Sequence, residues 1–340
     1  MTSRFPFTSF PNGWFQVAYS HELPAKAVKP LHYFGKDLVL FRAEDGIPHV
    51  FDAHCPHLGA HLGYGGKVQG ETIQCPFHGW CFNGDGKCVD IPYASKIPPK
   101  AQIRTWFVRE INGLILVYYH DRGEPPTWEM PELPECNSME WVPFYRYVER
   151  SKQKTHIQEL GEQVVDFPHI PLVHDPNNAL AKTETVYVDG PIRCELIKTR
   201  TKESFLGKFL KKPLEMNVEV IFYGLGLQAH KYYSVSRDHV DFFVLFSITP
   251  IDEEFIDVCQ LTSVKPSFNP LITSAFAKFI SQQIKIQAAL DIEILENKLY
   301  YSYPLLCEGD GEIMQYRRWA SQFYPEMFAK TSKISVHQQL

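Results

Sequence analysis

The sequence has no apolar run long enough to cross a lipid bilayer. A membrane-spanning helix needs about 18 to 20 consecutive apolar residues, and the longest runs here, 113–119 and 242–251, have the length of strands. The sequence also lacks an excess of positive charge, because 34 Lys and Arg stand against 39 Asp and Glu, for a formal net charge of −5. We therefore expect a soluble protein without a nucleic-acid partner.

The sequence also lacks the dense, regular Cys spacing of small secreted domains. Eight Cys are spread over 340 residues, and the N-terminal residues do not have the pattern of a secretory signal. We expect a cytoplasmic protein whose thiols are reduced. Two Cys belong to the motif described next. The other six are expected to be ordinary buried thiols: Cys81, Cys88, Cys136, Cys194, Cys259 and Cys307.

Two short runs near the N-terminus combine Cys with His. Cys55-x-His57 is followed, after 17 residues, by Cys75-x-x-His78. In a Rieske [2Fe–2S] cluster, two thiolates hold one iron and two imidazoles hold the other. Two Cys and two His also form structural zinc sites, but zinc fingers usually pair a CxxC loop with two later His on a helix. The pattern favours the Rieske cluster, and a zinc-stabilised binding module is the alternative.

The chain divides into two regions of different composition. Residues 1–122 contain short apolar runs between tight-turn signals, which predicts an all-β domain that carries the cluster. Four prolines between 123 and 135 indicate an extended linker, which we place at 123–147, and residues 148–340 follow as a second domain. Strands are predicted over 14–19, 38–42, 50–53, 72–74, 114–119, 184–188, 192–199, 216–223, 227–235, 241–249 and 256–264.

The second domain is predicted to be an antiparallel sheet wrapped around a long C-terminal helix, so the fold class is α+β. Residues 148–165 are polar and compatible with a helix. The long helix is expected to begin at Pro270, which suits a first turn, and to reach roughly residue 300. Apolar residues recur along it at helical intervals: Ile272, Phe276, Phe279, Ile280, Ile284, Ile286 and Leu290.

A sheet curled around a helix predicts a cavity for one elongated apolar ligand. Several large apolar strand residues suit the wall of such a cavity, and they suit an ordinary core equally well. They are Phe222, Leu225, Leu227, Phe243 and Leu245.

A second metal-binding pattern, Asp166-x-x-His169-x-x-x-x-His174, lies in the second domain. Two His and a carboxylate form the facial triad of non-haem Fe(II) oxygenases, which leaves coordination positions open for O₂. This pattern is weak alone, but downstream of a Rieske motif it indicates a mononuclear iron site.

The third ligand of that site is expected to be an acid on the long helix. Asp291, Glu293 and Glu296 are the candidates. Asp291 lies among apolar residues, where a carboxylate needs a partner such as a metal ion. Glu293 and Glu296 lie near Lys298 and suit a solvated helix face. We therefore predict Asp291.

Together, these features resemble the Rieske non-haem iron oxygenases over essentially the whole chain. Within that family the chain resembles the terminal oxygenase components of the steroid and sterol branch, which includes 3-ketosteroid 9α-hydroxylases and cholesterol 7-desaturases. The closer resemblance lies in residues 55–60, 75–80, 86–88, 91–93, 119–120, 128–129, 317–319 and 322–324.

The resemblance implies a mechanism and partners. A separate flavin and iron–sulfur reductase, or a ferredoxin, would bring electrons from NAD(P)H, so that NAD(P)H acts only indirectly. In a homotrimer, the cluster would pass them to the mononuclear Fe(II) of the neighbouring subunit. Asp166 would bridge a cluster His and His169 between the subunits. The enzyme would then use O₂ to hydroxylate, desaturate or demethylate a steroid or sterol.

Two departures from the family pattern stand out. The animal desaturases carry an N-terminal membrane anchor, which we do not expect here. Glu162-Gln163 stands where many relatives place Asn near the iron, so either Glu162 or Gln163 is a candidate for a role there.

Other readings remain open. The same chemistry on another bulky apolar molecule, such as a terpenoid, an alkaloid or an aromatic compound, is one alternative, and an acidic substrate would call for Arg193 or Arg237. A Rieske ferredoxin that only carries electrons is an alternative of another class, with no need for the second metal site. The apolar and basic segment 205–212 is expected to be a half-buried loop or short helix, with transient contact to a membrane surface as its alternative.

Overall fold

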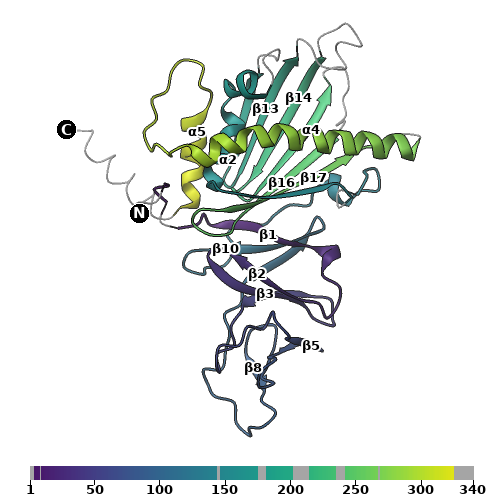
Figure 1. Cartoon of the computed structure of the whole chain (residues 1–340), viewed down its shortest axis with the longest axis vertical. Helices are drawn as coiled ribbons and strands as arrows, with labels where there is room; N and C mark the ends of the chain where they lie inside the picture. Colours follow the sequence, from purple (N-terminus) through teal and green to yellow (C-terminus); the bar gives the residue numbers. More distant parts are fainter. Residues whose placement is uncertain are drawn as a thin grey trace, which may run out of the picture. The chain divides into compact units, whose positions relative to one another are not determined.

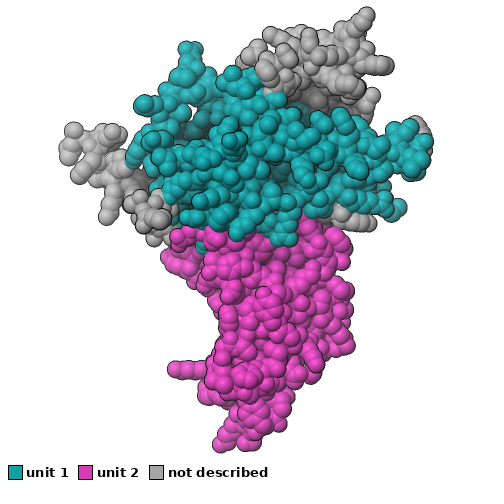
Figure 2. Space-filling model, viewed as in Figure 1, with its two compact units in different colours: residues 1–13, 133–248, 254–340 teal, residues 14–132, 249–253 magenta. Residues whose placement is uncertain are grey.

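A computed structural model describes residues 4–7, 9–143, 146–174, 181–201, 214–234, 242–266 and 269–324. The chain forms two compact units (Figure 2): unit 2 contains residues 14–132 and 249–253, and unit 1 contains residues 1–13, 133–248 and 254–340. The division between 132 and 133 falls inside the predicted linker 123–147. That stretch contains a short helix, α1 (Pro134–Asn137), and its boundaries as a linker stay a prediction.

Unit 2 is built from three small sheets, as the sequence predicted for the domain that carries the Cys and His motif. The strand orders are β1-β10-β9, β2-β3-β4 and β5-β6-β7-β8. Its elements are β1 (Gly13–Tyr19), η1 (Ser20–Glu22), β2 (Val28–Tyr33), β3 (Lys36–Arg42), β4 (Pro48–Asp52), β5 (Lys67–Gln69), β6 (Thr72–Gln74), β7 (Cys81–Phe82), β8 (Cys88–Asp90), β9 (Phe107–Ile111) and β10 (Leu114–Tyr119).

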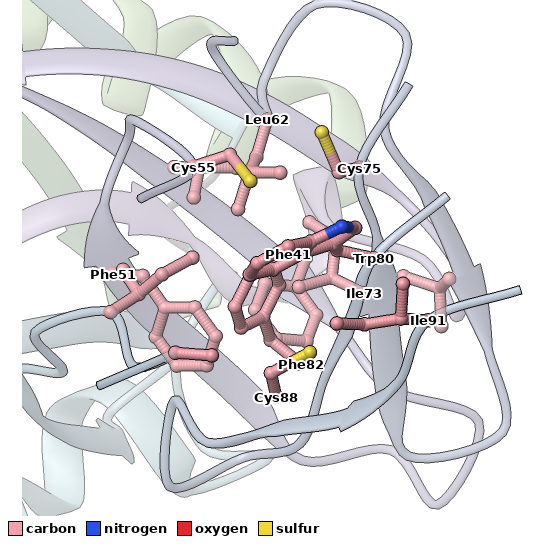
Figure 3. Packing of buried hydrophobic residues seen from close by; sticks show 14 residues of the cluster. Phe41, Phe51, Cys55, Leu62, Ile73, Cys75, Trp80, Phe82, Cys88 and Ile91 are labelled. Atoms are coloured by element: carbon pink, nitrogen blue, oxygen red, sulfur yellow. The ribbon is translucent and has the colours of Figure 1, made fainter. Parts of the chain in front are cut away.

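The core of unit 2 includes the two motif cysteines. Cys55 and Cys75 are buried, and Figure 3 shows them at one edge of a packed group of apolar side chains that includes Phe41, Trp80 and Phe82. The cysteine side chains therefore rest on a rigid base, because close-packed interiors leave little room for movement.

Unit 1 is a seven-stranded sheet with helices, in the order β11-β17-β16-β15-β14-β13-β12. The neighbouring strands pair antiparallel wherever a register is defined. Its elements besides α1 are β11 (Val148–Gln153), α2 (Ile157–Val165), η3 (Ile170–His174, a π-helical turn), β12 (Ala181–Asp189), β13 (Ile192–Thr201), β14 (Leu214–Tyr223), β15 (Leu227–Ser234), β16 (Phe242–Pro250), β17 (Ile256–Val264), α4 (Pro270–Asn297), α5 (Ile313–Ala320) and η4 (Ser321–Phe323).

The expectation of a helix over 148–165 is wrong for its first part, which forms the edge strand β11. The strand pairs with β17, with Val148 opposite Leu261. Arg150 binds the Asp257 carboxylate of β17 through its guanidinium, with Nε 2.9 Å from Oδ1. Cross-strand pairing of this kind outweighs the weak helix propensity of a polar segment.

Helix α4 lies across one face of the sheet (Figure 1) and contacts β17 and β11. Its start agrees with the prediction: the Asn269 side chain accepts hydrogen bonds from the first turn, 2.9 Å from the Leu271 nitrogen, and Pro270 follows as the first helical residue. The helix ends at Asn297. Among the described residues, no helix combines the length and apolar character needed to cross a bilayer.

The residues of α4 that face the sheet are mostly small or polar. The buried positions are Thr273, Ala277, Ser281, Asp291 and Leu295. Five of the large apolar residues that marked the helix in the sequence are exposed instead: Ile272, Phe276, Phe279, Ile286 and Leu290. Small side chains let the helix backbone approach the sheet, so that the Ser281 carbonyl accepts a hydrogen bond from Gln260 of β17 at 3.1 Å.

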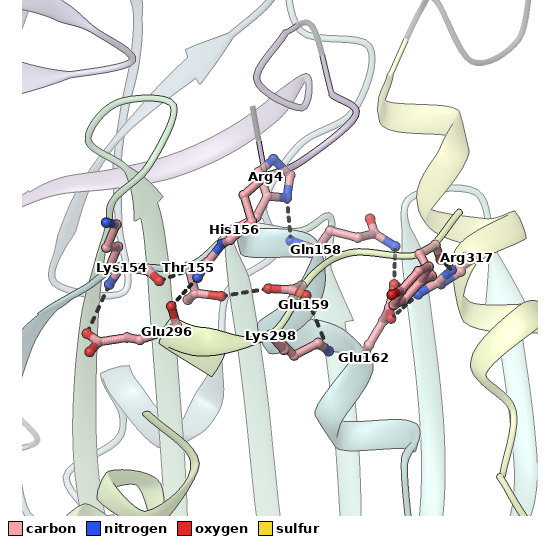
Figure 4. Close-up of polar contacts among 11 residues, drawn as sticks. Arg4, Lys154, Thr155, His156, Gln158, Glu159, Glu162, Glu296, Lys298 and Arg317 are labelled. Atoms are coloured by element: carbon pink, nitrogen blue, oxygen red, sulfur yellow. Dashed lines mark hydrogen bonds and ion pairs between the residues drawn. The ribbon is translucent and has the colours of Figure 1, made fainter. Parts of the chain in front are cut away.

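A buried ion pair ties α2 to α5 (Figure 4). The Arg317 guanidinium donates two hydrogen bonds to the Glu162 carboxylate, at 2.8 and 2.7 Å, and Gln158 donates a third at 3.2 Å. The helices touch closely at this point: a Cβ at Gly161 would lie 1.8 Å from the hydroxyl of buried Tyr316. Only glycine allows this approach.

A second group of polar contacts ties α2 to the residues that follow α4 (Figure 4). The fully buried Glu159 accepts a hydrogen bond from Thr155 at 3.0 Å and pairs with Lys298 at 3.3 Å. Two residues of α2, Glu159 and Glu162, are thus fixed by charged contacts in a poorly hydrated environment, where each contact is strong and its loss is costly.

All eight Cys are free thiols. Of the six outside the motif, Cys81, Cys88 and Cys259 are buried as expected and Cys136 and Cys194 are partly buried, whereas the expectation is wrong for Cys307, which is exposed. It lies in a turn after α4, where its backbone N–H donates to the Asp310 carboxylate at 2.6 Å.

Removal of Arg317 tests the buried ion pair. We expect Arg317→Ala to lower the free energy of unfolding by about 3–5 kcal/mol, because it leaves the Glu162 carboxylate buried without its cation. The matched control is Lys285→Ala, which breaks the exposed pair with Glu149 and should cost less than about 1 kcal/mol. Denaturant titration of both variants measures the difference, and equal losses would contradict the prediction.

Candidate metal centres and cavity

The two Cys and His loops of unit 2 have the same backbone design. In the first, the Cys55 N–H donates to the Ala60 carbonyl and the Gly59 N–H donates to the Cys55 carbonyl, both at 2.9 Å. The second loop repeats these bonds from Cys75 and Gly79, at 2.8 and 3.1 Å. Both glycines have a left-handed φ, 76° and 73°, which glycine adopts without steric cost. Each loop therefore turns tightly after its Cys and presents the nearby His.

The four predicted ligands lie together, with the cysteines on the inner side. Cys55 and Cys75 are 2% and 3% exposed, whereas His57 and His78 are half-buried, with ring centroids 4.6 Å apart. The His57 ring also stacks on Trp80 at 4.7 Å. Burial raises the pKa of Cys55 to about 11, so a thiolate here needs positive charge from metal ions. Paired thiolates inside and paired imidazoles outside fit a [2Fe–2S] cluster of the Rieske type.

In unit 1 the structure brings together His169, His174 and Asp291. The Nε2 atoms of the two His are 3.1 Å apart, and His174 Nε2 lies 3.4 Å from Asp291 Oδ2. One ligand atom from each residue lies within 4.8 Å of the others. The His come from the turn η3 and the residue before it, and the acid comes from α4, more than a hundred residues later in the chain.

The other candidate acids on α4 point elsewhere. Glu293 is exposed, and the Glu296 carboxylate accepts a hydrogen bond from the backbone N–H of Lys154 at 3.3 Å. Asp291 lies on the buried stripe of the helix, and its side chain is 13% exposed. Helix geometry thus separates Asp291 from two acids that are near it in sequence.

A backbone contact orients His169 for metal binding. His169 Nδ1 hydrogen-bonds the carbonyl of Asp166, and the Asp166 carboxylate lies 3.9 Å from the same nitrogen. Donation from Nδ1 leaves the lone pair of His169 on Nε2, which faces the other two residues. Burial lowers the pKa of His174, and neighbouring Gln287 opposes part of this shift. His174 is therefore a neutral imidazole near pH 7.

The electrostatics of Asp291 call for a cation. Burial raises its pKa to about 6, and its Oδ1 atom is buried without a hydrogen-bond partner among the described residues. A carboxylate in this position is costly unless it is paired. Two neutral imidazole nitrogens and one carboxylate are the ligand set of a non-haem Fe(II) site, so these residues fit that metal.

The three residues line a cavity of about 540 Å³ in unit 1. Ten of its other lining residues are apolar: Leu160, Val164, Ile170, Ile197, Val218, Val220, Phe246, Val258, Ala288 and Leu295. The rest are polar or amphipathic: Gln153, Gln163, Gln228, His230, Tyr232 and Gln287. A cavity of this size and character suits a small apolar molecule.

The structure separates the two residues of the pair 162–163. Gln163 lines the cavity with the predicted iron ligands, whereas Glu162 turns to α5 and binds Arg317. Consecutive residues of a helix point about 100° apart, so one helix serves both environments.

The large apolar strand residues considered for the cavity wall do not line it. Phe222, Leu227, Phe243 and Leu245 are fully buried, and Leu225 is 2% exposed. On β15 the wall is formed instead by the alternate residues 228, 230 and 232, because successive side chains of a strand point to opposite faces. In the sequence, the signal that identifies these wall residues is that they recur at every second position of the strand.

Arg193 is not available as a partner for an acidic substrate. It is 1% exposed, and its Nε donates to the equally buried Glu195 at 2.6 Å. Arg237 and the segment 205–212 lie outside the described residues.

Two protein families match the chain. Residues 13–106 match the Rieske [2Fe-2S] domain, and residues 117–324 match the 3-ketosteroid 9α-hydroxylase C-terminal domain. The first match agrees with the ligand set of unit 2 and disfavours a zinc-stabilised module.

Similar proteins cover nearly the whole chain. Cholesterol 7-desaturase of Xenopus laevis is 34% identical over 93% of this chain and 72% of its own length. A probable 3-ketosteroid-9-alpha-monooxygenase oxygenase component of Rhodococcus rhodochrous is 30% identical over 95% of this chain and 82% of its own.

Solved structures share the fold at lower identity. Dicamba monooxygenase bound to dicamba superposes with a TM-score of 0.70 at 18% identity, over 95% of this chain and all of the other. The NdmA mutant of Pseudomonas putida CBB5 with theobromine gives a TM-score of 0.70 at 18% identity, over 90% of this chain and 88% of the other. With its Rieske domain, its 3-ketosteroid 9α-hydroxylase C-terminal domain and these relatives, the chain belongs to the Rieske oxygenases, a family of iron-dependent oxidoreductases.

Proposed function

We propose that the chain is a terminal oxygenase that uses O₂ and electrons from a separate reductase to hydroxylate, desaturate or demethylate a steroid or sterol. The observation that carries this proposal is the convergence of His169, His174 and Asp291 on the wall of a largely apolar cavity, in a chain with a Rieske domain. The names of the relatives, a cholesterol desaturase and a ketosteroid monooxygenase, support the substrate class.

Each metal group has a proposed set of protein ligands. Cys55, His57, Cys75 and His78 would hold the [2Fe–2S] cluster, and the three residues of unit 1 would hold Fe(II). The mononuclear iron, when bound, supplies the coordination positions at which O₂ is activated.

The chain's own residues would position the substrate and exclude water. The apolar lining of the cavity favours an apolar ring system, because burial of apolar surface stabilises binding by about 25 cal/mol per Å². The ligands lie on the wall formed by η3 and α4, so the part of the substrate nearest these elements is the part that reacts.

Electrons are proposed to pass between the subunits of a homotrimer through Asp166. Its side chain is 39% exposed, and its carboxylate lies 3.9 Å from the iron-side imidazole of His169. In unit 2, Leu58 and Phe77, next to the cluster His, are 65% and 62% exposed. Exposed apolar residues beside a redox centre suit a protein contact.

Turnover of a substrate panel tests the proposed reaction. We expect the protein, loaded with cluster and Fe(II) and supplied with a surrogate reductase and NADH, to convert a sterol or 3-ketosteroid, because its cavity matches an apolar ring system in volume and lining. Terpenoids, alkaloids and aromatic acids form the comparison set, and products are identified by mass spectrometry. Conversion of these alone would contradict the proposed substrate class.

The variant His174→Ala separates an oxygenase from an electron carrier in the same assay. It should abolish product formation and leave the visible absorption of the cluster unchanged, because His174 belongs to unit 1. His32→Ala, which removes an exposed imidazole, serves as the matched control. Full oxygenation by His174→Ala would exclude the proposed iron site.

Removal of the Asp166 charge tests the path between subunits. We expect Asp166→Asn to keep its cluster and iron and to lower steady-state turnover about 10- to 100-fold, as for other residues that orient metal-bound imidazoles. Asp310→Asn, a change at the neighbouring acid, is the control and should retain turnover.

Co-expression of two inactive variants tests the trimer directly. Subunits with His78→Ala lack a competent cluster, and subunits with His174→Ala lack the iron site. Mixed oligomers should recover part of the activity if electrons cross between subunits. Absence of recovery in verified mixed oligomers would contradict the path.

The raised pKa of Asp291 predicts how Fe(II) binding depends on pH. Binding needs the ionised carboxylate, so as the pH falls below about 6 the affinity of the metal-free site should drop, by about tenfold per pH unit. Burial lowers the pKa of His174, which favours its neutral, metal-binding form. Anaerobic titrations between pH 5 and 8 measure the effect. The control Glu293→Gln should keep the same midpoint, and a flat profile would contradict the prediction.

A further inference from the structure

The cavity contains a histidine on the sheet that is not part of the predicted iron site. His230 lies in the middle of β15, opposite Val220 of β14 and Val244 of β16. Its ring lines the cavity and meets the ring of Phe246 edge-on, with centroids 4.9 Å apart. His230 is thus a polar group whose neighbours across the strands, and whose ring contact with Phe246, are apolar.

The ring of His230 is neutral and has an unused hydrogen-bonding atom. Burial lowers its pKa to about 4, so at pH 7 the imidazole has one N–H donor and one acceptor nitrogen. Nε2 is buried and has no hydrogen-bond partner among the described residues. An unsatisfied buried polar group costs about 1–3 kcal/mol, and one on a cavity wall is explained most simply by a partner that arrives with the ligand.

We propose that His230 hydrogen-bonds the single oxygen of an otherwise apolar polycyclic substrate, a hydroxyl or a ketone, and so determines how the substrate is oriented. This inference rests on the proposed function and deepens it. A neutral imidazole donates to a ketone, and it donates to or accepts from a hydroxyl. Because no Lys or Arg is among the described residues that line the cavity, the same wall disfavours a carboxylate substrate.

The position of His230 gives the hydrogen bond a geometric consequence. His230 lies on the sheet wall, whereas His169, His174 and Asp291 lie on the wall formed by η3 and α4. An oxygen held at β15 therefore anchors one end of the ring system and leaves another part to face the predicted iron ligands. Such anchoring at a distance from the reacting carbon is a known use of binding energy in catalysis.

Gln153 is the best internal comparison. It also lines the cavity, and its Oε1 atom is buried without a partner among the described residues. Its Nε2, however, already donates to the Ser151 hydroxyl at 3.0 Å. The atom left without a partner is therefore the Oε1 acceptor, which a ketone oxygen does not satisfy.

Equilibrium binding to the loaded protein tests the inference without turnover. The ligands are cholesterol, cholest-4-en-3-one and the deoxygenated hydrocarbon cholest-5-ene. Wild-type protein should bind each oxygenated ligand about 5- to 100-fold more tightly than the hydrocarbon. His230→Phe should reduce both ratios to within about threefold, while Gln153→Leu should keep the wild-type ratio for the ketone cholest-4-en-3-one, because the orphaned Oε1 of Gln153 only accepts hydrogen bonds. If His230→Phe loses the binding ratio for only one of the two oxygenated ligands, the oxygen group of that ligand is the one that His230 recognises.

Several outcomes would overturn the inference. Retained ratios in His230→Phe exclude the inference, because this variant lacks Nε2. Loss of the ketone ratio in Gln153→Leu alone also excludes it. Wild-type protein that binds all three ligands equally also excludes it, whereas wild-type protein that binds none of them refutes the proposed substrate class instead. His230→Phe should melt no lower than wild type without ligand, because it removes an unsatisfied buried nitrogen. If it fails to fold, His230→Leu and His230→Gln replace it, and only the Gln variant should keep part of the ratios.

Discussion

Unit 1 depends on a carboxylate that is buried beside two imidazoles. Burial raises the pKa of Asp291 and lowers that of His174, so each group is destabilised in its charged form. A bound cation would pair the buried carboxylate and accept the lone pairs of imidazoles, and burial already favours the neutral form of His174. Without the metal, the buried carboxylate destabilises the folded state, and favourable contacts elsewhere in the fold compensate for this free energy, as is usual for functional sites.

The backbone of α4 makes this arrangement possible. The helix comes close to β17 because its inward positions are small or polar, with Ala277 and Ser281 among them. Large side chains on that face would hold the helix away from the sheet, and Asp291 away from the His pair. Ile280 and Ile284 pack against the core, whereas five other large apolar residues of α4 are exposed, so hydrophobicity alone does not identify the inward face of the helix.

Helix α2 connects the site to the rest of unit 1. Its Gln163 faces the cavity, while Glu162 and Glu159 are fixed by Arg317 and Lys298 on the other sides of the helix. The segment that carries Asp166 and His169 begins where α2 ends. Charged contacts in a buried environment therefore restrain the first residues of the site before a metal is bound.

The fold, and the two groups of residues that we propose as metal ligands, were largely visible in the sequence, because most of them depend on local signals. Paired Cys and His at short spacing identify a metal loop, and the apolar period from Ile272 onwards identifies a helix. Predictions that depended on long-range contacts were less reliable. The strand at 148–153 was missed because its stability comes from β17, and the face that α4 turns inward was not visible in the periodicity of its large residues.

The sequence by itself determined the candidates: which Cys, His and carboxylate residues are proposed to bind iron, and which acid lies in an apolar environment. Only the tertiary structure decided the surroundings of that chemistry. It brought Asp291 to the His pair across more than a hundred residues, and it selected Gln228, His230 and Tyr232 rather than Leu227 for the cavity wall. The physical reason is that ligand spacing is local, whereas a cavity wall depends on strand register, where a shift of one residue exchanges the two faces of the sheet.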